Sequence, residues 1–381
     1  MKWEKVKLGD IATFSNGINF HKTAYAKGIK LIGVSNFGDR FYPDYSQLQE
    51  VKKDIVRLED CLRNGDIVFV RSNGNKELVG RCMLVKNPTE RVTYSGFCIR
   101  ARLNDTDRYD PVYFTYYFKS KAFRRAVSGT AVGANIQNLS QARLSNHECR
   151  IPSIEVQHRI ADILSVYDDL IENNQKQIKL LEEAAQRLYK EWFVDLRFPG
   201  HENTKIVDGV PEGWRRGLLK ELISVNYGKD HKKAPDDGNI PVYGSGGLMR
   251  KCNKSLFSGE AVLIPRKGSL NNIMYVDETF WTVDTMFYAT MKQPHTAVFV
   301  YFFVKAFDMY SMNIGAAVPS MTAKILDAMD VVIPDKETLE KFDKCAKTYF
   351  NKIKTLQGQN ERLKTARNLL LPKLMSGEVE V

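Results

Sequence analysis

The chain has 381 residues, a hydrophobic content of 43% and a formal net charge of +11. These values are typical of a soluble protein with room for two domains, and the positive charge suggests a polyanionic partner such as nucleic acid. The longest apolar run, Ala297 to Val304, has eight residues, whereas a transmembrane helix needs about 20. The charged start "MKWEKVKLGD" has no apolar core of a secretory signal, so we expect a cytoplasmic protein.

The sequence contains an internal repeat, and a repeat decides how the fold is organised. The segment "GTAVGANIQNLSQARLSNHECRIP" (129–152) returns in altered form as "GAAVPSMTAKILDAMDVVIP" (315–334). The two halves also open alike at an offset of 211 residues, and from Asn138 onward the offset is 182 without a gap. The sequence therefore predicts two domains of common origin, each with a variable part and a constant part.

The variable parts contain short strands and helices. The runs "DIVFV", "RCMLV", "AVLIP" and "IMYV" are β-branched or apolar and bounded by turn residues, which is typical of strands. "PVYFTYYFKSKAFRRAV" and "AVFVYFFVKAF" predict short aromatic-rich helices. "YGSGG" (243–247) predicts a hairpin turn rather than a cofactor loop. Between the halves, "RFPGHENTKIVDGVPEG" (197–213) predicts a linker, because it holds two prolines and three glycines.

A long helix is predicted after each variable part. In residues 154–193, apolar side chains recur at alternating spacings of four and three, which is a heptad seam with one polar member. The counterpart 182 residues later is weaker, because Gly358 costs about 1 kcal/mol within a helix and Pro372 should kink or end the last turn. Each helix could pack only on its own domain, but two matched seams favour packing of one helix on the other.

The polar members of the two seams give the direction of the helices. Asn174 is fifth of ten positions and Asn360 is sixth of ten, so the amides meet only in an antiparallel pair. An unpartnered buried amide costs about 1–3 kcal/mol. We therefore predict an α+β protein with two pseudo-twofold-related domains, each followed by a long helix, and an antiparallel coiled coil whose register Asn174 and Asn360 fix. Facing residues then have numbers that sum to 534, and Tyr167 should stack on Arg367.

The sequence predicts no catalytic residues and no metal site. It lacks an N-P-P-[FY] loop of amino-methyltransferases and a G-x-x-x-x-G-K-[ST] phosphate loop. The six cysteines form no C-x-x-C pair, so neither zinc nor a disulfide framework is expected. One nuclease-like pattern, Pro43-Asp44 followed by Glu50-Val51-Lys52, is more typical of a solvated loop.

Polar and basic loops in both halves are candidates for DNA contact, because arginine reads guanine, asparagine reads adenine, and lysine and serine hold phosphates. The matched positions of "VRSNG" and "PRKGS" in the two repeats favour residues 70–74 and 265–269 most strongly. The predicted DNA-binding residues are Asn19, His21, Lys22, Arg71, Ser72, Asn73, Lys76, Lys229, Tyr243, Arg266, Lys267, Ser269 and Asn272.

This layout resembles the specificity subunit of type I restriction–modification systems over essentially the whole chain. The most specific matches are "RLYKEWFVDLRFPG" (187–200), "GVPEGW" (209–214), "RNLLLPKLMSGEVEV" (367–381) and the "IP" before each long helix. The resemblance implies target recognition domain 1 in 1–152, a central conserved helix in 153–196, a linker in 197–212, target recognition domain 2 in 213–334, and a distal helix with a C-terminal tail in 335–381. The departures are the missing "PEG" before Trp3, the short second domain and Gly358.

The resemblance also implies partners. In that family each recognition domain reads one half of a bipartite, asymmetric site in double-stranded DNA. The helices are the platform for two methyltransferase (M) subunits, and two restriction (R) subunits complete the complex. The chain itself should catalyse nothing and bind no cofactor, since S-adenosylmethionine belongs to the M subunit, and ATP and magnesium belong to the R subunit. Two other interpretations remain, namely a coiled-coil scaffold that binds no DNA and a stand-alone DNA-modifying enzyme with unrecognised motifs.

Overall fold

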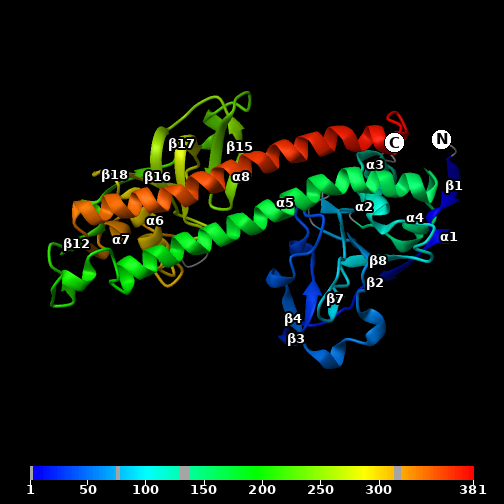
Figure 1. Ribbon diagram of the computed structural model, residues 1–381, viewed down its shortest axis with the longest axis horizontal. Coiled ribbons are helices and arrows are strands. Elements are labelled where there is room, and N and C mark those ends of the chain that lie inside the picture. The colour runs from blue at the N-terminus through cyan, green and yellow to red at the C-terminus, as the bar shows by residue number, and fades with distance from the viewer. Residues whose placement is uncertain (1–2, 74–77, 129–137, 313–318) are drawn as a thin grey trace. The chain divides into compact units, whose positions relative to one another are not determined.

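The computed structural model describes residues 3–73, 78–128, 138–312 and 319–381, which fold into two compact units. Unit 1 comprises the chain up to Asn174 together with 358–381, and unit 2 comprises 175–357. The chain passes from unit 1 to unit 2 within helix α5 (Ile154–Tyr189) and returns within helix α8 (Lys336–Ser376), the two long helices of Figure 1. Both long helices that the heptad spacing predicts are confirmed.

Unit 1 contains a four-stranded sheet of order β2-β8-β5-β6, a three-stranded sheet of order β4-β3-β7 and the pair β1-β9. Its elements before α5 are β1 (Glu4–Lys7), α1 (Leu8–Ile11), β2 (Ala12–Asn16), β3 (Tyr25–Ile32), β4 (Gln49–Val51), β5 (Ile67–Val70), β6 (Cys82–Leu84), β7 (Val92–Tyr94), β8 (Cys98–Leu103), α2 (Pro111–Lys119), α3 (Lys121–Ser128), α4 (Gln141–Ser145) and β9 (Glu148–Ile151). The expected aromatic-rich helix and the strands "DIVFV" and "RCMLV" are thus present.

Unit 2 is built on a six-stranded sheet of order β13-β18-β16-β17-β14-β15 and the pair β12-β19. Its elements before α8 are β10 (Ile206–Val207), β11 (Val210–Pro211), β12 (Arg215–Leu218), β13 (Ile223–Tyr227), β14 (Ile240–Gly244), β15 (Gly247–Cys252), β16 (Phe257–Pro265), β17 (Met274–Thr282), β18 (Met286–Met291), α6 (Ala297–Lys305), α7 (Ala323–Asp327) and β19 (Asp330–Ile333). The hairpin at 243–247 is confirmed, and the segment expected as a linker holds the small hairpin β10–β11.

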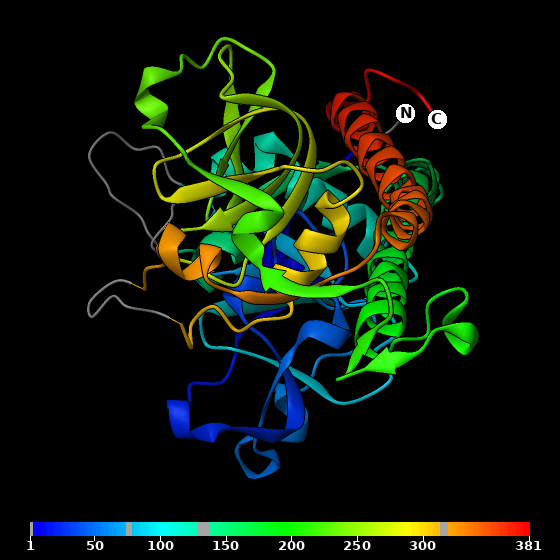
Figure 2. The same cartoon turned by 90° about the vertical axis from the view of Figure 1, so that its left-hand side faces the viewer.

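The two units repeat the same strand pairing. Glu4 pairs with Ile151 in unit 1, and Arg215 pairs with Ile333 in unit 2, at the offsets of 211 and 182 seen in the sequence. The short aromatic helices are equivalent as well. In unit 2, α6 packs between the sheet and the long helices, where its side chains share one core with Trp192 and Phe342 (Figures 1 and 2). The sequence repeat is therefore a repeat of structure.

Trp214 of the motif "GVPEGW" contacts the residue that caps the start of α8. Asp335 caps the helix, since its carboxylate accepts hydrogen bonds from the Thr338 backbone N–H (2.9 Å) and hydroxyl (2.7 Å). The indole N–H of Trp214 donates to the same carboxylate at 2.9 Å. Burial alone would raise the pKa of Asp335, but these hydrogen bonds leave it lowered, so the cap is a charged carboxylate.

The distal helix is longer and more regular than its sequence predicts. α8 continues through Gly358 and Pro372 and ends at Ser376, where Gly377 has a φ of +74°. The sequence predicts that Pro372 ends or kinks the last turn. The helix does not end there, since it continues for four more residues. Pro372 is exposed, while Leu371 and Leu374 beside it are buried in the core of unit 1, so packing holds the turn that lacks one backbone hydrogen bond.

The antiparallel register is confirmed at two positions. The side-chain amide of Asn174 donates to the amide oxygen of Asn360 at 2.9 Å in unit 1, where both side chains are buried. In unit 2, the rings of Trp192 and Phe342 lie 5.8 Å apart between centroids. Both pairs have numbers that sum to 534.

A buried ion pair lies beside the seam in unit 1. The guanidinium of Arg367 pairs with the carboxylate of Asp168, which also accepts a hydrogen bond of 2.7 Å from the Tyr116 hydroxyl of α2. Only 4% of the Asp168 side chain and 13% of the Arg367 side chain are exposed. Arg367 therefore bonds to the neighbour of Tyr167 instead of stacking on Tyr167, because its long side chain reaches one position off the seam.

Unit 2 replaces this ion pair with apolar contacts. The repeat offset of 182 relates Asp168 to Phe350 and Ala185 to Arg367. Ala185 is fully buried in the core of unit 2, and Phe350 packs against that core with its ring 5.9 Å from the ring of Tyr301 on α6. The same junction between an aromatic helix and the coiled coil is thus ionic in one unit and apolar in the other.

Candidate nucleic-acid interface

Arg71 and Arg266 occupy equivalent places in the two units, each directly after an interior strand of its sheet, β5 or β16. The backbone N–H of Arg71 donates to Phe97 O (2.8 Å), and its carbonyl accepts from Leu139 N (2.8 Å). The N–H of Arg266 donates to Thr285 O (2.8 Å), and its carbonyl accepts from Met321 N (2.9 Å). The bonds match one to one, so Arg71 corresponds to Arg266.

The two arginine side chains are held in the same way. A terminal N–H of Arg71 donates to Gly96 O at 3.1 Å, and a terminal N–H of Arg266 donates to Asp284 O at 3.4 Å. Each carbonyl belongs to the turn before strand β8 or β18. A guanidinium has five N–H donors, and each of these contacts uses one of them.

In unit 1 the other predicted residues lie around the same turn. The Gly96 N–H donates to Ile18 O at 2.7 Å, which places the loop carrying Asn19, His21 and Lys22 against the turn, and all three side chains are exposed. Ser72 pairs with Asn138 through an isolated β-bridge and leads to Asn73. Lys76 lies outside the described residues. The structure thus brings the predicted residues of the first repeat that it describes into one loop cluster.

Unit 2 gathers its predicted residues in the corresponding place. Lys229 is exposed, and its backbone N–H donates to Thr282 O at 2.9 Å. Lys267 pairs with Ser320 through an isolated β-bridge, as Ser72 does with Asn138. Ser269 is exposed, and the Asn272 side chain donates to Ser245 O at 2.9 Å, which ties this loop to the β14–β15 turn.

Tyr243 has a different environment from the other predicted residues. Its hydroxyl donates to the Glu278 carboxylate at 2.5 Å, and its carbonyl accepts from Val283 N at 3.0 Å. Burial and the bonded carboxylate raise the pKa of the Tyr243 hydroxyl, which stays protonated. In this structure Tyr243 supports the hairpin, and its hydroxyl is already hydrogen-bonded.

Exposed aromatic side chains belong to the same clusters, although the sequence pattern did not single them out. Phe97, 63% exposed, lies in the turn that holds Arg71. The guanidinium of Arg266 lies 5.5 Å from the ring centroid of Tyr227, which is 54% exposed. Tyr310, 44% exposed, donates through its hydroxyl to Gly268 O at 3.2 Å. The sequence signal that could have identified these residues is an aromatic side chain placed in a turn, away from the apolar runs that form the core.

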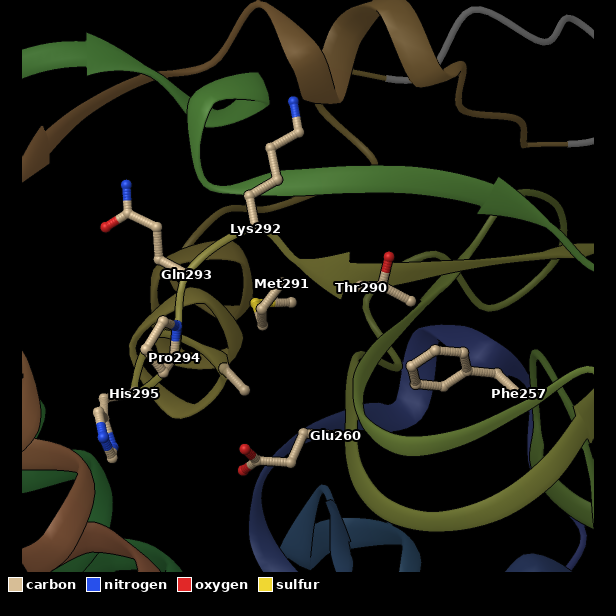
Figure 3. A pocket seen from close by; sticks show the side chains of 9 residues that line it. Phe257, Glu260, Thr290, Met291, Lys292, Gln293, Pro294 and His295 are labelled. Carbon is tan, nitrogen blue, oxygen red and sulfur yellow. The ribbon is translucent and has the colours of Figure 1, made fainter.

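A pocket of about 400 Å³ in unit 2 lies outside this cluster (Figure 3). Its lining includes Glu260 and His295, which belong to a chain of charged contacts: His295 to Asp343 (2.8 Å), Asp343 to Lys347 (2.8 Å), and Lys347 to Glu260 (2.9 Å). Burial lowers the pKa of Lys347, but its hydrogen bonds to both carboxylates outweigh this and leave it raised. The contacts join the sheet of unit 2 to α8, so we interpret them as a structural junction.

The described residues give no sign of a nuclease site or a metal centre. Asp44 accepts from the Ser46 backbone N–H (3.1 Å) and Glu50 from the Gly28 N–H (2.6 Å), so both carboxylates of the nuclease-like pattern support local turns. No group of three or more histidine, cysteine or acidic residues converges within the described ranges. In the same part of the chain, no helix has the length and apolarity that crossing a bilayer requires.

A family model and several known proteins match this chain, and all of them are type I restriction specificity proteins. A family model described as "Type I restriction modification DNA specificity domain" matches residues 1–183 and 211–365. The chain is 26% identical over 344 residues to the type I restriction enzyme MjaIX specificity subunit of Methanocaldococcus jannaschii, covering 80% of this chain and 76% of that protein. It is 23% identical over 483 residues to the HindI specificity subunit of Haemophilus influenzae, covering 99% of each.

A solved structure shows the same fold. The crystal structure of the type I restriction–modification S subunit from M. genitalium superposes with a TM-score of 0.57 at 18% identity, covering 98% of this chain and 96% of that one. The two ranges matched by the family model correspond to the two structural repeats. The chain therefore belongs to the family of type I restriction–modification DNA specificity subunits.

Proposed function

We propose that this chain reads a bipartite, asymmetric site in double-stranded DNA, with one half-site read by each repeat. The observation that carries the proposal is the equivalence of Arg71 and Arg266, whose backbone and side-chain hydrogen bonds match although the residues around them differ. Equivalent frames present an arginine to each half-site, while the differing neighbours Ser72, Asn73 and Lys267, with the flanking loops, make the two half-sites different.

We also propose that the long helices dock two methyltransferase subunits, with two restriction subunits completing the complex. Along α5 in unit 1, Ile163, Val166 and Leu170 are 36%, 56% and 45% exposed and follow one another at helical spacing, which forms an apolar stripe. S-adenosylmethionine would belong to the methyltransferase subunits, and ATP and magnesium to the restriction subunits. The assembled complex would act in the cytoplasm, where its DNA lies.

The proposal is tested by exchanging one recognition domain. Replacing residues 1–152 with the corresponding domain of a relative should change one half of the methylated sequence and leave the other half unchanged, as mapped by sequencing of modified adenines. A change in both halves would contradict independent reading. As a control, the purified chain without partners, incubated with DNA, S-adenosylmethionine, ATP and magnesium, should neither methylate nor cut the DNA.

Replacing Arg71 or Arg266 with alanine should relax specificity at one base of one half-site, because a guanidinium that pairs with guanine contributes about 1–3 kcal/mol of discrimination. The measurement is binding of the assembled complex to a set of DNAs with single-base changes. Arg108→Ala is the matched control. Phe97 precedes strand β8, whereas Arg108 comes after its other end, away from the arginine loop, and pairs with Glu4 at 2.8 Å. A uniform loss of affinity over all DNAs would instead identify a phosphate contact.

A scaffold that binds no DNA is the competing interpretation. It explains the coiled coil but gives no reason for two equivalent arginine loops. Phosphate contacts make DNA affinity fall steeply as salt rises from about 50 to about 200 mM. If the assembled complex does not bind DNA, or binds it with an affinity that stays constant over this salt range, the scaffold is favoured.

A further inference from the structure

The β14–β15 hairpin of unit 2 exposes two adjacent apolar side chains, Leu248 (61%) and Met249 (53%). Neighbouring residues of a regular strand point to opposite faces. Here the pairing of β14 with β15 shifts by one residue, because Tyr243 pairs with Leu248 whereas Val242 pairs with Arg250. Met249 is the extra residue of this β-bulge, and such a bulge re-aims a side chain. Both apolar side chains therefore face solvent.

The hairpin is fixed between two loops of the candidate interface. On one side, the Arg250 guanidinium donates to His231 O (2.5 Å) and Ala234 O (2.7 Å) and pairs with Asp236, which holds the lysine-rich loop 229–236 beside the hairpin. On the other side, the Asn272 side chain donates to Ser245 O in the hairpin turn, which fixes the loop that begins at Arg266. The apolar pair thus lies on a rigid part of the predicted DNA-contact surface.

Positive charge surrounds the apolar pair. The exposed lysines of the hairpin and the adjacent loop are Lys229, Lys232, Lys233, Lys251 and Lys254. The same segment carries Asp230, Asp236 and Asp237, so residues 229–254 have six lysines and arginines against three aspartates and a net charge of +3. An apolar tip with a cationic rim complements a polyanion that offers apolar groups in a groove, and this description fits duplex DNA.

We propose that Leu248 and Met249 determine specificity by contacting the C5-methyl group of a thymine in the half-site read by the second repeat. The inference rests on the proposed function. A two-stranded β-ribbon fits the major groove, where the thymine methyl is the apolar group among the base edges. Gly246 and Gly247 in the turn have no side chain, and no neighbouring atom lies within 4 Å of the position that a Cβ would take, so no other described residue covers the ribbon tip.

Within its described residues, the first repeat has no tight hairpin at the corresponding place. There β3 takes the place of β14, since each pairs in parallel with the strand before the turn, β7 or β17, and antiparallel with the next strand, β4 or β15. The connection from β3 to β4 runs from Gly33 to Leu48 and not through a tight turn. The thymine contact should therefore belong to one half-site only.

The experiment uses the chain assembled with its methyltransferase subunits and duplexes in which each thymine is replaced in turn by uracil, which lacks only the methyl group. The wild-type complex should bind about fourfold more weakly when one thymine of the second half-site is replaced, because one buried methyl contributes about 0.8 kcal/mol. Leu248→Ala with Met249→Ala should bind both duplexes equally. Ile206→Ala is the matched control, an exposed apolar residue of the β10–β11 hairpin, and should keep the difference.

The remaining outcomes distinguish failure of the methyl contact from failure of the proposed function. If no thymine is sensitive to uracil, or if the double variant discriminates as the wild type does, the methyl contact is wrong while sequence-specific binding stands. If 2-aminopurine beside the site becomes fluorescent with wild type and not with the double variant, the pair unstacks bases as a wedge and the methyl contact is again wrong. If the wild-type complex binds all sequences equally, the proposed function itself fails.

Discussion

Replacing Arg367 with alanine is expected to lower the free energy of unfolding by about 3–5 kcal/mol, because a buried carboxylate loses its counter-charge. Asp168 would keep a single hydrogen bond from the Tyr116 hydroxyl, in a place where 4% of its side chain is exposed. Urea denaturation of the purified chain, followed by circular dichroism, measures the loss. Arg362→Ala, an exposed position of the same helix, is the matched control and should change stability by less than about 0.5 kcal/mol.

Unit 2 supplies the compensating variant. Asp168→Phe combined with Arg367→Ala installs in unit 1 the residues that the repeat has at Phe350 and Ala185. Replacing a buried ion pair with apolar residues is often neutral or stabilising. We expect most of the lost stability to return, and to return fully when Tyr116→Phe removes the hydroxyl that has lost its acceptor. A double variant as unstable as Arg367→Ala alone would show that the ion pair is not what the junction requires.

Replacing Asn174 alone with leucine is expected to cost about 1–3 kcal/mol, because the buried amide of Asn360 loses its partner. Replacing both asparagines with leucine should instead raise stability above that of the wild type, since an apolar pair fills the seam. The double variant should, however, lose the specific register, because two leucines pair equally well when one helix shifts by a heptad. Thermal unfolding of the two single variants and the double variant measures the first effect.

Engineered cysteines measure the second effect, in a background where the exposed Cys345 is serine. Cysteines at 178 and 356 should oxidise readily in the wild-type seam, whereas cysteines at 178 and 363, one heptad apart from that pairing, should not. In the double leucine variant both pairs should form. Cross-linking restricted to 178 and 356 in the double variant would show that the asparagines do not fix the register.

The coiled coil could be predicted closely from the sequence, whereas its neighbours could not. The seam spacing and the two asparagines determine direction and register, because a buried amide tolerates few partners. The Asp168–Arg367 pair escaped prediction because a carboxylate one position off the seam has the same sequence pattern as a solvated one. The prediction for Pro372 failed for a related reason: the burial of Leu371 and Leu374 is a tertiary effect that no local propensity contains.

The candidate interface shows the same division. The matched loops around Arg71 and Arg266 could be located from the repeat, and the hydrogen bonds then give their one-to-one equivalence. Leu248 and Met249 could not be identified in this way, because alternation along a strand predicts that one of two neighbours is buried. Only the bulge in the β14–β15 pairing exposes both.

The unequal junctions also limit which helices can pair. If two copies of the first repeat associated through α5 in the antiparallel register seen here, each Asp168 would lie where its partner has Ala185, since Ala185 is the repeat equivalent of Arg367. Two carboxylates would then be buried without a counter-charge, at a cost of several kcal/mol for each ion. Two copies of the second repeat would instead bury Arg367 of each copy against Phe350 of the other. The ion pair in one unit and the apolar contact in the other therefore favour the single chain that joins the two different repeats over a homodimer of either half.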